Sequence, residues 1–97
     1  MRNRSSGVAA RDRPVISATY ELRWDEAYRA FLLSSRDATI RLNESAAEIL
    51  KRCDGAHSVA TVVREVQALY ADDHTRIESG VYVFLAVARG RGWVHVR

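Results

Sequence analysis

The side chains that could act as nucleophiles or metal ligands are few and scattered. Cys53 and His57, spaced i and i+4, could form part of a metal site or a Cys–His nucleophile pair. A structural zinc ion normally needs four ligands, and His74 and His95 lie far along the sequence in other segments. Cys53 is better explained as a small core residue of a short helix. We therefore expect no catalysis, no metal site and no cofactor.

Acidic residues and glycines give no stronger indication of an active site. The glutamates that stand at or near predicted helix starts or on polar faces are explained by capping and solvation; they are Glu44, Glu48, Glu65 and Glu78. The Gly-Arg-Gly run at residues 90–92 resembles no phosphate-binding loop and is typical of a helix end. These residues therefore favour a binding protein over an enzyme.

Composition limits the architecture to one small domain. The chain has 97 residues, of which 47% are hydrophobic, as expected for a folded globule. No apolar run approaches the roughly 20 residues of a membrane span, and the first residues lack the apolar segment of a secretory signal. A single cysteine cannot form an internal disulfide, which fits a cytoplasmic location.

The net charge of +3 comes from the N-terminus, where four arginines stand against Asp12. This segment is rich in Arg, Asn, Ser and Gly, so we predict a disordered basic tail over residues 1–14 and a folded domain over residues 15–97. The remainder of the chain is neutral by the same count. The basic composition is therefore weak evidence for nucleic-acid binding by the folded part.

Alternating patterns predict three strands before any helix. Residues 20–24 alternate apolar with charged side chains, residues 27–33 are rich in β-forming types, and residues 38–42 alternate again. A polar turn over residues 34–37 separates the last two. Short connections favour a three-stranded antiparallel meander in which residues 38–42 form an edge.

A helical period follows from residue 43. The first helix is expected over residues 43–53, capped by Asn43 or Ser45, and the second begins near Ser58. The third begins with the capping-box spacing of Thr75 and Glu78 and ends near residue 90 or 92. Residues 93–96 are expected to close the fold as a short extended tail. The predicted fold is α+β and winged-helix-like, a three-stranded antiparallel meander followed by a three-helix bundle.

A winged helix raises the alternative of a DNA-binding regulator. A DNA-reading helix needs basic and amide side chains backed by phosphate contacts. The second helix offers Arg64 and Gln67 beside Glu65, and the charge on the other helices is equally mixed. DNA binding is therefore the weaker of the two predictions. The edge strand over residues 38–42 can accept an extended peptide as another strand. Arg41 would either protect this edge against unwanted pairing or contact an acidic partner.

Several segments together are similar to one family. They are the motif LNESAAEIL at residues 42–50, CDG at 53–55, the valine-rich helix from residue 59, the Phe-Leu pair at 84–85 and RGW at 91–93. With the opening strand from residue 20, they resemble PqqD, the pyrroloquinoline quinone (PQQ) biosynthesis protein D. The turn over residues 34–37 and Gly80 in the third helix depart from the family pattern. A divergent homologue that serves another peptide-modifying enzyme is therefore a second interpretation of the resemblance.

The resemblance implies a cytoplasmic, non-catalytic peptide chaperone. Such a protein binds the precursor peptide PqqA and presents it to the radical-SAM enzyme PqqE; no nucleic acid, membrane or cofactor is implied. Related domains hold the peptide as a strand added beside the third strand and against the third helix. Carried onto this chain, the peptide-binding residues are Thr39, Ile40, Arg41, Leu42, Val81, Phe84, Leu85 and Ala88. The protein is expected to be a monomer or a strand-swapped homodimer.

Overall fold

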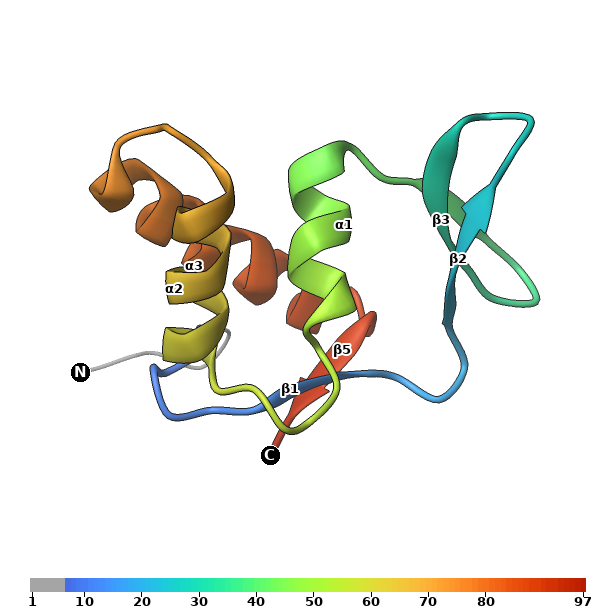
Figure 1. Ribbon diagram of the computed structural model, residues 1–97. Helices are drawn as coiled ribbons and strands as arrows, with labels where there is room; N and C mark the ends of the chain where they lie inside the picture. The colour runs from blue at the N-terminus through green and yellow to red at the C-terminus, as the bar shows by residue number, and fades with distance from the viewer. Residues whose placement is uncertain (1–6) are drawn as a thin grey trace.

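The computed structural model describes residues 7–97 and has an α+β fold (Figure 1). Its elements in chain order are β1 (Pro14–Ile16), β2 (Glu21–Asp25), β3 (Ala30–Ser34), β4 (Thr39–Arg41), α1 (Glu44–Lys51), α2 (Val59–Leu69), α3 (His74–Gly90) and β5 (Val94–Val96). The β2–β3 hairpin stands to one side of the helices, and α1 lies between it and the other two. The predicted meander and three helices are confirmed.

The meander has the order β2-β3-β4, with all neighbours antiparallel. Leu22, Leu33 and Ile40 lie opposite one another and share the face that packs on the core, where Leu33 is fully buried. The strand predicted over residues 27–33 begins only at Ala30. The cause is a tight turn in which the Asp25 carboxylate accepts the Tyr28 N–H at 2.9 Å and Arg29 adopts a φ of 52°.

Side-chain caps fix where the helices begin. The Asn43 side chain accepts the Ala46 N–H at 2.8 Å, so Asn43 rather than Ser45 caps α1. Ser58 caps α2 as predicted, by accepting the Thr61 N–H. The capping box expected at Thr75 is wrong, because the Asp73 carboxylate accepts the Thr75 and Arg76 N–H groups and starts α3 earlier.

A second, two-stranded sheet joins the two ends of the described chain. Strands β1 and β5 pair antiparallel, with Val15 opposite His95, and cross beneath the helices in Figure 1. The expected tail over residues 93–96 is thus a paired strand. Its partner lies far away in sequence, and strands of three residues carry little periodicity to reveal such a pairing.

Residues 7–14 belong to the segment that was expected to be a disordered tail over residues 1–14, but in the structure they pack against the helices. The Asp12 and Ala10 carbonyl oxygens accept the Val59 and Ala60 N–H groups at 2.8 and 3.0 Å, and Arg89 donates to the Gly7 carbonyl. These bonds satisfy N–H groups at the start of α2, which have no partner within the helix. The part of the predicted tail at residues 1–6 lies outside the described residues.

The core lies where the three helices meet the inner face of the meander. Its fully buried side chains come from β3, α1, α2, α3 and β5; the largest include Leu33, Leu50, Val62, Leu85 and Val94. Arg52 ties α1 to α2 by binding Glu48 at 2.9 Å and Glu65 at 2.7 Å. No helix within residues 7–97 is both long enough and apolar enough to span a bilayer.

Candidate functional site

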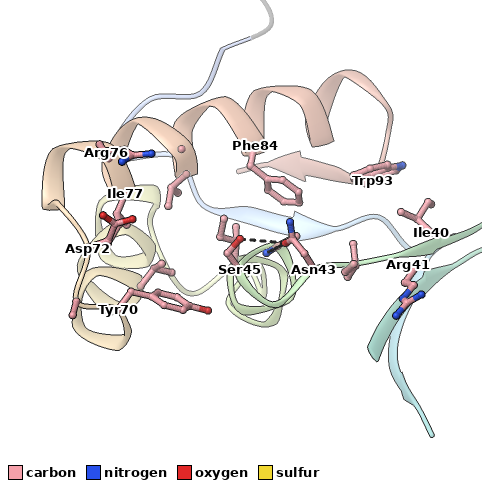
Figure 2. Close-up of a pocket in the computed structure, with 17 residues that line it drawn as sticks. Ile40, Arg41, Asn43, Ser45, Tyr70, Asp72, Arg76, Ile77, Phe84 and Trp93 are labelled. Carbon is pink, nitrogen blue, oxygen red and sulfur yellow. Dashed lines mark hydrogen bonds between the residues drawn. The ribbon is translucent and has the colours of Figure 1, made fainter. Parts of the chain in front are cut away.

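A cleft of about 680 Å³ opens between β4, the start of α1 and the outer side of α3. Figure 2 shows Phe84 of α3 and Trp93 on one wall, Ile40 and Arg41 of β4 at one end, and Tyr70 and Asp72 at the other. Ala46, Ile49 and Val66 also line it. The wall is therefore apolar over most of its length, with polar groups from Asn43 and Ser45 near its middle.

One side of β4 carries main-chain groups with no partner in the sheet. The Leu42 N–H donates to the Phe31 carbonyl and the Ala38 carbonyl accepts the Ser35 N–H, so residues 38, 40 and 42 bond toward β3. Main-chain groups of successive strand residues point to opposite sides. The N–H and C=O groups of Thr39 and Arg41 therefore face the open edge, where an extended peptide could bond to them.

The Arg41 side chain lies on the outer face of the sheet. Its guanidinium carbon is 5.7 Å from the centroid of the Tyr28 ring, a cation–π geometry, and Figure 2 shows it directed away from Ile40. Arg41 lies opposite the buried Leu32 on β3. What Arg41 offers to a neighbouring strand is therefore mainly its backbone.

The structure brings most of the predicted binding residues together. Ile40, Arg41, Leu42, Val81 and Phe84 line the cleft, and Thr39 lies on the same open edge. Leu85 and Ala88 differ: both are completely buried in the core behind the wall. Their burial follows from the helical period, which turns them into the core while Phe84 lines the cleft.

Several residues that line the cleft were not among the predicted binding residues. Ile77 could have been found from its i, i+4 spacing to Val81 on the apolar stripe of α3. Trp93 reaches the wall because the chain turns back after α3, and its ring lies 6.3 Å from that of Phe84. Tyr70 and Arg76 come from either side of the α2–α3 connection and carry no local signal of a site.

Potential reactive groups lie elsewhere. The Cys53 thiol is in the core, where it donates to the Ile49 carbonyl, and burial raises its pKa to about 12. The pKa of Asp54 is lowered to about 2, first by the hydrogen bond from the His57 ring at 2.9 Å. Neither residue lines the cleft. The cleft thus offers main-chain hydrogen bonds and apolar surface, which suit binding.

Solved structures share this architecture. The solution structure of the PqqD truncation of Methylobacterium extorquens PqqCD, a ribosomally synthesized and post-translationally modified peptide (RiPP) recognition element, superimposes with a TM-score of 0.77. It is 23% identical in sequence, and the match covers 93% of this chain and 96% of that one. Lasso peptide synthetase B1, solved in complex with its leader peptide, has a TM-score of 0.72 at 20% identity, covering 86% and 98%. At these identities the likeness establishes the fold.

Sequence relatives establish the family. A PqqA binding protein of Acinetobacter baylyi is 31% identical over 81 residues, covering 84% of this chain and 81% of the relative. A PqqA binding protein of Methylococcus capsulatus is 33% identical over 79 residues, covering 81% and 83%. Residues 29–94 match the family model of coenzyme PQQ synthesis protein D. The chain therefore belongs to the PqqD family.

Proposed function

We propose that this protein binds a PqqA-type precursor peptide as an added strand along β4 and presents it to a PqqE-like radical-SAM enzyme. The observation that carries the proposal is the open edge at Thr39 and Arg41 beside an apolar cleft. Family membership and the names of the relatives support the choice of peptide. The protein itself performs no chemistry in this account, and it acts in the cytoplasm.

Main-chain pairing and apolar burial have different roles in such a site. Each hydrogen bond to Thr39 or Arg41 contributes only about 0.5–1.5 kcal/mol net, and ordering a flexible peptide costs several kcal/mol. The larger favourable term is burial of apolar side chains against Ile40, Phe84 and Trp93, at about 25 cal/mol per Å². Pairing therefore sets the direction of the peptide, and side-chain burial supplies most of the affinity.

Presentation follows from the geometry of an added strand. The peptide covers the edge of β4 with one side of its backbone and keeps its other edge free. Residues of the peptide beyond the cleft stay unbound and accessible to an enzyme. The protein can therefore hold one segment while the enzyme modifies another.

Calorimetric titration of the protein with a synthetic PqqA-type peptide tests binding, with Phe84→Ala as the test variant and Val83→Ala as its control. Phe84 lines the cleft, whereas Val83 is 63% exposed on the same helix and does not. We expect saturable binding, about tenfold or more weaker in Phe84→Ala and changed less than twofold in Val83→Ala. Peptide turnover by the PqqE-like enzyme should rise with wild-type protein and rise less with Phe84→Ala.

Two results would contradict the proposal. One is the absence of saturable peptide binding; the other is an equal loss of affinity in both variants. Sequence-selective binding to duplex DNA that persists at 0.2 M salt would favour the DNA-binding alternative instead. Circular dichroism of both variants establishes that any loss of binding is not a loss of fold.

A further inference from the structure

The end of the cleft farthest from β4 carries one charged side chain of each sign, Asp72 and Arg76. Three residues with charged side chains line the cleft: Arg41, Asp72 and Arg76. Figure 2 shows Arg76 and Asp72 together at one end, with Ile40 and Trp93 at the other. Because Arg41 places its guanidinium over the Tyr28 ring on the outer sheet face, the Arg76 end is where a guest would meet a charge inside the cleft.

The polar groups around Arg76 are already engaged with the backbone. The Asp72 carboxylate accepts the Asp73 N–H at 2.8 Å, and the Asp73 carboxylate accepts the N–H groups of Thr75 and Arg76. In the middle of the cleft, the Asn43 side-chain oxygen accepts from both the Ser45 hydroxyl and the Ala46 N–H. Each of these groups therefore already has a hydrogen-bond partner within the protein.

The Arg76 guanidinium differs from them. Within residues 7–97 it makes no hydrogen bond and no ion pair, although other arginines of the domain, such as Arg52 and Arg89, are bonded to carboxylates or carbonyls. A guanidinium presents donors that match a carboxylate in a two-bond geometry. An exposed arginine is common on any surface, but this one lines a cleft that is otherwise apolar.

We infer that Arg76 is a specificity-determining residue that selects a guest peptide with a carboxylate side chain beyond its strand-forming segment. The inference rests on the proposed function, which it deepens by naming the chemistry of the guest. The strand-forming segment pairs with Thr39 and Arg41, apolar side chains contact Phe84 and Ile77, and an Asp or Glu then reaches Arg76. Neutral peptides of equal hydrophobicity bind less tightly.

A double-mutant cycle tests this inference. The wild-type protein, Arg76→Gln and Arg64→Gln are titrated with a PqqA-type peptide and with peptides in which each Asp or Glu is singly changed to its amide. Arg64 is exposed on α2 outside the cleft, so its variant controls for the lost charge alone. We expect Arg76→Gln to weaken binding about three- to tenfold and Arg64→Gln less than twofold.

One amide substitution in the peptide should weaken binding to the wild type by the same factor and have no further effect on Arg76→Gln. Restored affinity between Arg76→Glu and a peptide with Lys at that position would support the same pairing. Equal affinities of wild type and Arg76→Gln, equal losses in both protein variants, or no coupled acidic position would overturn the inference while leaving strand addition intact. Failure of the wild type to bind the parent peptide would overturn the proposed function as well.

Discussion

The Leu42 N–H donates to the Phe31 carbonyl oxygen at 3.0 Å, and this bond determines which side of β4 stays open. It fixes the alternation of the strand, so that Ile40 bonds to β3 while Thr39 and Arg41 face away from it. Ile40 also directs its side chain into the cleft. The same short strand therefore supplies an apolar contact from one residue and main-chain groups from its two neighbours.

Replacing Arg41 by proline should weaken peptide binding about tenfold, because it removes one outward-facing N–H and blocks close approach of a strand. Proline is tolerated on an edge strand where the N–H faces solvent, so we expect the free energy of unfolding to fall by no more than about 1 kcal/mol. Arg41→Ala is the matched control, since it removes the contact with Tyr28 and keeps the N–H. Equal affinities of the two variants in calorimetry would contradict the assignment of this edge.

Two glycines should respond oppositely to replacement by alanine. Gly55 has a φ of +80°, so Gly55→Ala should cost about 1–2 kcal/mol of stability; an added Cβ would also lie 2.8 Å from the flexible end of Arg97. Gly80 lies within α3, and an added Cβ would meet nothing within 4 Å, so Gly80→Ala should add about 0.5–1 kcal/mol of stability. Urea denaturation measures both. Changes of the same sign in the free energy of unfolding of the two variants would contradict the backbone conformation described for one of the two glycines.

Acid should destabilise the protein partly through Asp54. Hydrogen bonds from the His57 ring and from the Ala56 N–H lower the pKa of Asp54 from its usual 3.8 to about 2 in the folded state. The unfolded chain then binds the proton more readily, so this stabilisation is complete above pH 4 and is lost as the pH falls through about 2. Urea midpoints measured between pH 2 and 5 should decline less steeply in Asp54→Asn. Parallel curves for the two proteins would contradict this assignment.

The Cys53 thiol should be unreactive in the folded protein. Burial, with a smaller effect of the Asp54 charge, raises its pKa to about 12, so the thiolate is scarce at pH 8. A chromogenic disulfide reagent should therefore react slowly in buffer and rapidly in 6 M urea. Fast reaction of the native protein would mean that the core around Cys53 opens readily.

The strands and helices that could be predicted from the sequence are those with a local signal. The alternation through Ile40 and Leu42 predicted β4, and Ser58 predicted the start of α2. The start of β3 was placed too early because Tyr28 has high β propensity. The Asp25 carboxylate and the positive φ of Arg29 override that propensity in the turn.

What could not be predicted depends on contacts between distant segments. The pairing of β1 with β5 and the bonds from Asp12 and Ala10 to the start of α2 are backbone interactions that composition does not reveal. The cleft likewise combines residues that had a local sequence signal with residues that only the fold brings together. Phe84 and Ile40 were predicted as contacts, whereas Trp93 and Arg76 join them only because the folded chain brings the segment before β5 and the first turn of α3 to the cleft.

Amide hydrogen exchange, followed by NMR with and without a saturating PqqA-type peptide, tests the open edge most directly. Strand addition along β4 predicts that the Thr39 and Arg41 amides exchange at least about tenfold more slowly when the peptide is bound. The Ile40 and Leu42 amides, which already bond to β3, should change much less. Unchanged exchange at Thr39 and Arg41 in a protein saturated with peptide would contradict strand addition along β4.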